Sequence, residues 1–282
     1  MKLEIVHRTS YEYSRNVGLL PHRLMLSPRN DQHLRTLAFQ IDCTPAGSID
    51  WSQDVFGNTV ATITFSQNAS ELTITSTAVV EQTADPWPVF KIDPGAHAYP
   101  FTYSSEDMTD LGAFTVATSI GGRVSEWAET FVLSRPTDTL SLLKDINAGI
   151  LTSVTYRIRD EEGTQSPQET LELASGSCRD IAALFIDAVR HLGFGARAVS
   201  GYVYDPQAPI DDGGSTHAWA EVYLPGAGWI AFDPTHRRVG EASLIPVAIA
   251  RSNSQIMPIS GGYMGLASDF VRLAVSVKVA ER

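Results

Sequence analysis

Gly176-Ser177-Cys178-Arg179-Asp180 is followed by Thr216-His217-Ala218-Trp219-Ala220-Glu221-Val222-Tyr223, and then by Phe232-Asp233-Pro234-Thr235. A cysteine, a histidine and an aspartate therefore occur in that order, each within its own local pattern. Thiol catalysis requires a nucleophile, a base that ionises it, and an acceptor that orients the base. The three segments together predict a thiol site, and their local patterns show how each residue could reach it.

The residues after Cys178 have the apolar spacing of a helix that is buried along one side. The apolar positions are Ile181, Leu184, Phe185, Ala188, Val189 and Leu192. They follow the i, i+3, i+4, i+7 pattern, and Gly193 is suited to end the helix. Counting back from Ile181 places Cys178 in the first turn, on the same stripe. Ser177 and Asp180 match a capping box, with Ser177 as the N-cap.

A thiolate in a first helical turn lies at the positive end of the helix dipole, near N–H groups that lack helical partners. Both features favour ionisation of Cys178, and the same N–H groups could hold an oxyanion. A cysteine on an apolar helical stripe is also an ordinary core residue in many proteins. The helix alone leaves both interpretations open.

Two β-like segments around Pro225-Gly226-Ala227-Gly228 predict a hairpin over residues 217–233. Pairing Tyr223 with Trp229 places Asp233 opposite Trp219 and diagonal to His217. Diagonal neighbours lie roughly 7–8 Å apart, within reach of two side chains. A register slip of one residue would put His217 and Asp233 on opposite faces. The expected result is a hydrogen bond between them; separately, each is also typical of a plain strand histidine or a turn aspartate.

The first ninety residues have the pattern of short β-strands separated by turns, which predicts an antiparallel sandwich. The expected strands cover residues 3–7, 11–13, 37–41, 59–65 and 72–80. A proline-rich stretch from Asp85 to Pro100 suits a crossing between domains. The predicted division is an N-terminal β domain over residues 1–95 and a catalytic domain over residues 96–282.

The second half starts with helical patterns and continues with strands. Helices are expected over residues 124–133, 139–151 and 167–173 and after Cys178, and strands over 196–204, 217–224, 229–233 and 271–279. Helices followed by strands indicate an α+β domain. The predicted fold class is therefore α+β, with the helices and antiparallel sheet preceded by an all-β sandwich-like domain.

The composition limits the classes of binding partner that can be expected. The 282 residues carry a net charge of −11, and the basic residues are scattered, so we expect no nucleic-acid binding. The N-terminal residues lack an apolar signal-peptide core, and no run of eighteen apolar residues occurs, so we expect a cytoplasmic chain that does not enter membranes. Cys43 is expected to be a reduced structural residue. No cluster with metal-ligand spacing is evident, so neither metal nor cofactor is expected.

With these residues identified, the chain resembles a bacterial member of the transglutaminase-like superfamily of papain-type thiol enzymes. The match runs from Thr164 through Gly176–Asp180 and His217–Tyr223 to Gly228–Thr235. The N-terminal half is similar to the β domain that precedes this core in bacteria, through His7–Tyr13, Arg23-Leu24 and Phe56-Gly57-Asn58. The resemblance implies a papain-like core, with Cys178 as nucleophile, His217 as general base and acid, and Asp233 as the orienting carboxylate.

The chain departs from the family pattern at two places. His236 stands where relatives commonly have asparagine after Asp-Pro-Thr, and Arg251-Ser252-Asn253 stands where they tend to have an Arg-Asp pair. Both bear on contacts to substrates or partners. The extra oxyanion donor of the family is not evident from the pattern, and Gln165 and Tyr156 are upstream polar candidates.

The expected chemistry is acyl transfer through a thioester on Cys178, with a peptide or protein amide as substrate. We expect a peptidase or amidase, because water is abundant and no lysine-binding tunnel is evident. A cross-linking transglutaminase is the alternative enzyme. A non-catalytic binding scaffold is the alternative of another class, because this fold also carries such modules.

Overall fold

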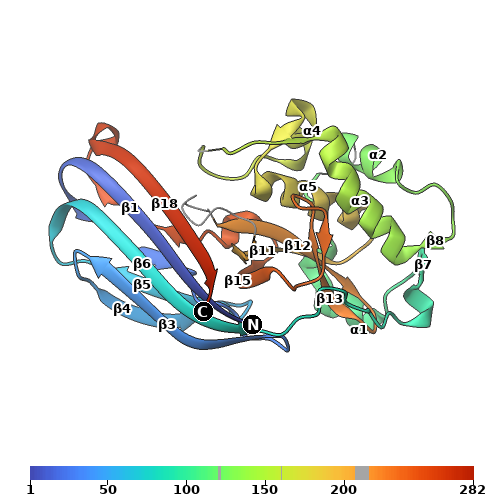
Figure 1. Cartoon of the computed structure of the whole chain (residues 1–282). Helices are drawn as coiled ribbons and strands as arrows, with labels where there is room; N and C mark the ends of the chain where they lie inside the picture. Colours follow the sequence, from blue (N-terminus) through green and yellow to red (C-terminus); the bar gives the residue numbers. More distant parts are fainter. Residues whose placement is uncertain (120–121, 160, 207–215) are drawn as a thin grey trace.

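The computed structural model describes residues 1–119, 122–159, 161–206 and 216–282. It consists of a β-sandwich lobe and a mixed lobe of helices around a sheet, which lie side by side (Figure 1). The α+β fold class predicted from the sequence is confirmed.

Two antiparallel sheets form the sandwich. The first has the order β17-β1-β6-β3, with β18 also paired to β1, and the second has the order β16-β2-β5-β4. The strands are β1 (Lys2–Leu19), β2 (His22–Leu24), β3 (Leu34–Thr44), β4 (Ser48–Gln53), β5 (Thr59–Thr64), β6 (Asn68–Gln82), β16 (Ile259–Ser260), β17 (Tyr263–Met264) and β18 (Phe270–Glu281). Side chains from both sheets, among them Val17, Leu24, Ile63 and Leu72, pack into one buried cluster between them. Cys43 is a free thiol that packs at the edge of this cluster, as expected.

The sandwich includes residues from both halves of the chain. Strand β18 pairs with β1 along most of its length, from Leu3 opposite Glu281 to Tyr13 opposite Phe270. The predicted division had assigned residues 96–282 to the catalytic domain, but β16, β17 and β18 belong to the sandwich sheets. The alternation over 271–279 correctly indicated a strand. It carried no signal for its partner, because β-sheet pairing is set by contacts that are distant in sequence.

The mixed lobe is built on an antiparallel sheet of order β14-β13-β12-β11-β15. Its strands are β11 (Ala196–Val203), β12 (His217–Leu224), β13 (Gly228–Asp233), β14 (Arg238–Val239) and β15 (Leu244–Ala250). The helices are α1 (Ser105–Leu111), α2 (Arg123–Glu129), α3 (Thr139–Ser153), α4 (Pro167–Leu173) and α5 (Cys178–His191). Two short pairs complete the lobe, β7 (Ala98–Tyr99) with β8 (Thr137–Asp138) and β9 (Thr155–Tyr156) with β10 (Ser175–Gly176).

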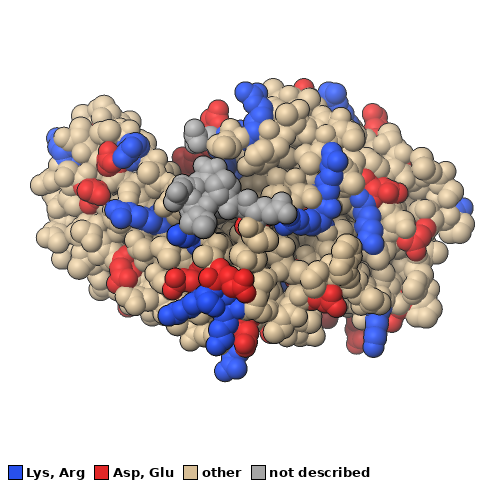
Figure 2. All heavy atoms as spheres, in the orientation of Figure 1, with Lys and Arg blue, Asp and Glu red and all other residues tan. Residues whose placement is uncertain are grey.

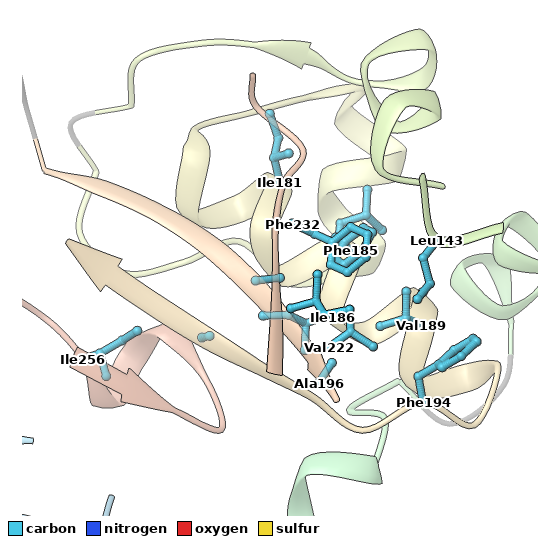
Figure 3. Packing of buried hydrophobic residues seen from close by; sticks show 14 of the residues in the cluster. Leu143, Ile181, Phe185, Ile186, Val189, Phe194, Ala196, Val222, Phe232 and Ile256 are labelled. Atoms are coloured by element: carbon cyan, nitrogen blue, oxygen red, sulfur yellow. The ribbon is translucent and has the colours of Figure 1, made fainter. Parts of the chain in front are cut away.

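Helix α5 is the centre of this lobe. Its apolar stripe packs on β11, β12 and β13, where Phe185 stacks on Phe232 at 5.5 Å between ring centroids (Figure 3). Helices α2, α3 and α4 pack against its other flanks. The helix is therefore buried on nearly all sides, which is more than the one-sided pattern predicted, and its buried Arg190 donates to backbone carbonyls of Phe114, Ala196 and Arg251. Because the core fixes α5, it also fixes the position of Cys178.

The two lobes share one continuous apolar core, and Asn58 adds a polar connection between them. Asn58 is fully buried; its amide donates to the carbonyl of Ile249 at 2.7 Å and accepts from the N–H of Ile249 at 2.9 Å. Arg29 donates to the same amide oxygen at 2.7 Å. The turn Phe56-Gly57-Asn58 of the sandwich thus satisfies the backbone of β15 in the catalytic sheet.

One face of the molecule shows little segregation of charge. On the face drawn in Figure 2, lysine and arginine side chains lie among aspartate and glutamate side chains. Among the described residues, no helix is long and apolar enough to cross a membrane.

Replacing Asn58 by alanine is expected to destabilise the protein by roughly 2 kcal/mol or more, because it leaves the buried N–H and C=O of Ile249 without hydrogen-bond partners. Chemical unfolding monitored by tryptophan fluorescence measures the change. The matched control is Asn68→Ala on an exposed position of β6, which is expected to change stability by less than about 0.5 kcal/mol. Equal stability of the two variants would contradict the role assigned to Asn58.

Candidate active site

Cys178 is the first residue of α5 and is partly exposed to solvent. The residue before it, Ser177, is the N-cap, and the Asp180 carboxylate accepts hydrogen bonds from its backbone N–H at 2.9 Å and its hydroxyl at 2.7 Å. The predicted capping arrangement is confirmed. The sulfur therefore lies at the helix start, where the dipole favours a negative charge.

The Asp180 carboxylate also organises the loop in front of the helix. It is fully buried and accepts from Nε of Arg159 at 2.9 Å and from the backbone N–H of Gln165 at 2.7 Å. Burial alone would raise the pKa of Asp180, but these donors and Ser177 hold it below its usual range. The sequence pattern predicted the cap but gave no sign of Arg159, which lies on the far side of a loop.

The residue after Cys178 is tied to two further segments. The guanidinium of Arg179 donates to the carbonyls of Gly163 at 2.7 Å and Glu161 at 2.7 Å. The carbonyl of Arg179 accepts from the amide of Asn253 at 2.7 Å. One of the two departures from the family pattern therefore lies directly against the nucleophile's neighbour.

The β12–β13 hairpin brings His217 and Asp233 together. Tyr223 pairs with Trp229, as predicted, and the register continues to Ala220 opposite Phe232. Nε2 of His217 lies 2.9 Å from Oδ2 of Asp233, and both residues are buried. The hydrogen bond predicted from the parity of the hairpin is confirmed. Trp219 stacks on the His217 ring at 5.9 Å between centroids and closes one side of it.

Cys178 joins this pair through a hydrogen bond with His217, and the backbone N–H of Ala218 also donates to its sulfur. Because Nε2 of the ring faces Asp233, Nδ1 is the nitrogen left for Cys178. The structure thus brings together all three residues predicted for the site, although they come from one helix and two strands.

The ionisation of the site follows from its burial and its charges. Burial alone would raise the pKa of the Cys178 thiol, but the hydrogen bond and positive charge of His217, together with Ala218 N–H, lower it overall. Burial alone would lower the pKa of His217, but Asp233 and Cys178 outweigh it and raise that pKa to about 10. The pKa of Asp233 is well below its usual range, because donors from His217 and His236 overcome its burial. The shifts of both pKa values favour a thiolate–imidazolium pair.

Asp233 has a further partner that the sequence did not reveal. Nδ1 of His236 lies 2.7 Å from Oδ2 of Asp233, the same oxygen that His217 contacts. The backbone N–H of Thr235 binds the other oxygen at 3.1 Å. The side chains of His217, Asp233 and His236 are close enough to hold a metal ion. Spacing along the chain does not indicate this cluster, because the turn after β13 brings its members together.

The two upstream candidates for an oxyanion donor occupy different positions. The charge of Cys178 contributes to raising the pKa of Tyr156, after burial, so this phenol lies within electrostatic reach of the sulfur. Tyr156 also pairs with Gly176 in the short parallel sheet that precedes α5. The side chain of Gln165 instead accepts from Thr170 of α4 at 3.3 Å. Tyr156 therefore interacts electrostatically with the sulfur, and the Gln165 side chain lies beside Gly176, two residues before Cys178.

The arrangement of a sandwich lobe and a helix-and-sheet lobe, with a cysteine at a helix start facing a histidine–aspartate pair, defines a papain-like thiol fold. Two family models match adjacent parts of the chain: a bacterial transglutaminase-like N-terminal region over residues 3–81 and the transglutaminase-like superfamily core over residues 125–234. Residues 125–234 thus belong to the transglutaminase-like superfamily, and residues 3–81 match the N-terminal region of its bacterial members.

The similarity to known proteins covers nearly the whole chain. An uncharacterised protein of Mycobacterium tuberculosis is 28% identical over 278 residues, which cover 92% of this chain and 87% of that protein. An uncharacterised protein of Mycobacterium leprae is 21% identical over 98% of both chains. A crystal structure described as a candidate cysteine protease from Cytophaga hutchinsonii has a TM-score of 0.74 and 19% identity, and covers 100% of this chain and 91% of that one. This last similarity supports the fold.

The ion pair predicts a characteristic pH dependence. The lowered pKa of Cys178 means that its thiolate persists below the ordinary thiol pKa of about 8.5 and is lost only when the pH falls through the lowered value. We expect iodoacetamide to alkylate Cys178 at pH 6 at least about tenfold faster than Cys43, because only the thiolate reacts. Peptide mapping by mass spectrometry gives the two rates in one sample.

Two variants serve as controls for this measurement. Cys43→Ser should leave the rate at Cys178 unchanged, whereas His217→Ala should remove the advantage at pH 6. A wild-type rate that simply rises with pH to a midpoint near the ordinary thiol value of about 8.5 would show that Cys178 is an unactivated thiol.

Proposed function

We propose that the protein is a cysteine-dependent acyl-transfer enzyme that acts on amide or peptide bonds. The specific activity we propose is that of a peptidase or amidase. The observation that supports this proposal best is the connected set of hydrogen bonds from Cys178 to His217 and from His217 to Asp233. A nucleophile, a base and an orienting acceptor in hydrogen-bond contact are the minimal equipment for covalent thiol catalysis.

In the first half of the proposed reaction, the Cys178 thiolate attacks the carbonyl carbon of the substrate amide and forms a carbon–sulfur bond. Helix-start N–H groups and the Tyr156 hydroxyl are the proposed donors to the resulting oxyanion. His217 then gives its Nδ1 proton to the amide nitrogen, the carbon–nitrogen bond breaks, and the amine leaves. A thioester remains on Cys178.

In the second half, His217, now neutral, takes a proton from water, and the oxygen attacks the thioester. The carbon–sulfur bond breaks, the carboxylic acid leaves, and the thiolate–imidazolium pair forms again. Asp233 keeps Nε2 protonated throughout, so that Nδ1 always faces the reaction. Partial exposure of Cys178 supports water as the usual acceptor.

A primary amine could replace water in that second half, which would make the enzyme a cross-linking transglutaminase. The match to the transglutaminase-like core supports keeping this alternative. The two reactions share the thioester and differ only in the acceptor.

The thioester can be tested without knowing the natural substrate. With p-nitrophenyl acetate, we expect acetylation of Cys178, seen by intact mass and peptide mapping, with release of p-nitrophenolate. Cys178→Ala and His217→Ala should each lower the rate at least about a thousandfold, because neither leaves a competent nucleophile–base pair. Circular dichroism shows whether each variant folds.

The acceptor is then identified with blocked glutamine peptides. Ammonia release that is unaffected by an added primary amine indicates an amidase, and incorporation of the amine indicates a transglutaminase. Failure of Cys178 to acylate, combined with an ordinary alkylation rate at pH 6, would leave the non-catalytic scaffold as the better explanation.

A further inference from the structure

The cluster of His217, Asp233 and His236 presents three metal-ligand side chains around one point. One ligand atom from each lies within 4.8 Å of the other two. Nε2 of His217 and Nδ1 of His236 both contact Oδ2 of Asp233, at 2.9 and 2.7 Å. A thiol mechanism uses His217 and Asp233 but has no use for His236.

The donor set suits a transition-metal ion rather than a calcium or magnesium ion. Two imidazole nitrogens and one carboxylate oxygen are a ligand set that zinc accepts, with a fourth position left open for another group. Hard cations prefer a shell made only of oxygen. The residues therefore select zinc or a similar ion by their chemistry.

The geometry allows such an ion after a small adjustment. Zinc bonds of about 2.0–2.2 Å in a tetrahedral site separate the ligand atoms by roughly 3.3 Å. The two hydrogen-bonded pairs must therefore open by about half an ångström, and the two ring nitrogens, which lie within 4.8 Å of each other, must take up the same separation. His217 and Asp233 are buried, but 37% of the His236 side chain is exposed. His236 is the member that can shift, and it gives an ion access from solvent.

We propose that His217, Asp233 and His236 form an inhibitory binding site for zinc or a similar divalent transition-metal ion. To bind, Nε2 of His217 releases its proton to solvent, and Nδ1 of His236 transfers its proton to the other nitrogen of its own ring or to solvent. Metal–nitrogen bonds replace the two hydrogen bonds to Asp233. Because each proton competes with the ion, the affinity falls as the pH is lowered.

Occupancy of this site stops the chemistry of Cys178. His217 loses its hydrogen bond to Asp233, and with the ion bound at Nε2 the ring keeps its Nδ1 proton, which it could release only by becoming an imidazolate. Cys178 then has no acid–base partner. The inhibition rests on the proposed thiol function, whereas the binding of the ion does not.

Binding is tested in the Cys43→Ser/Cys178→Ala variant, which has no thiol that could hold zinc instead. Competition with a chromophoric chelator should show one zinc ion bound per chain. Adding His236→Asn should weaken binding at least about tenfold, which corresponds to about 1.4 kcal/mol. The matched control is His191→Asn, because His191 also lies beside a buried aspartate, Asp187, at 3.5 Å, and its loss should change nothing.

Inhibition is tested by the rate at which acetyl-Cys178, formed with p-nitrophenyl acetate, is hydrolysed in the Cys43→Ser protein. Zinc should slow this hydrolysis, a chelator should restore it, and His236→Asn should need at least about tenfold more zinc for the same effect. Equal zinc affinity with and without His236, loss of binding in the thiol-free protein, or hydrolysis that zinc leaves unchanged would each overturn the proposal. An ordinary alkylation rate in the metal-free protein would overturn the thiol function but not the metal site.

Discussion

The register of the β12–β13 hairpin is the constraint on which the site depends. His217 and Asp233 share a face only because Tyr223 lies opposite Trp229. A shift of one residue would turn one of them to the other side of the sheet. The opposite face of the sheet carries Phe232, which stacks on Phe185 of α5. Packing of the helix therefore enforces the register, and the register aligns the histidine with the cysteine at the start of that helix.

Much of the active site could be predicted because its signals are periodic and local. The apolar stripe after Cys178 fixed the helix and its start, and strand alternation fixed the common face of His217 and Asp233. The periodicity of apolar residues shows which face of a helix or strand is buried. It therefore also shows the direction of the catalytic side chains on the same element. The cap formed by Ser177 and Asp180 was readable for the same reason, since its members are three residues apart.

The remaining contacts could not be predicted because they join segments with no sequence relation. Arg159 reaches Asp180 across a loop, and Asn253 reaches Arg179 from the end of the catalytic sheet. His236 is a single residue in a turn, where no periodic pattern exists to show its direction. The partner of β18 was hidden for a similar reason, because a strand's own alternation does not identify the neighbouring strand.

The return of β18 to β1 has a consequence for the order in which the protein is made. The catalytic lobe is an insertion between the first and last strands of the sandwich, and the N–H of Arg282 binds the carbonyl of Lys2 at 3.0 Å, near where the two ends meet (Figure 1). During synthesis, β1 must wait for residues 270–281 before its free edge is covered. Cys178 has by then already been synthesised, so completion of the sandwich is a late event that follows translation of the entire catalytic lobe.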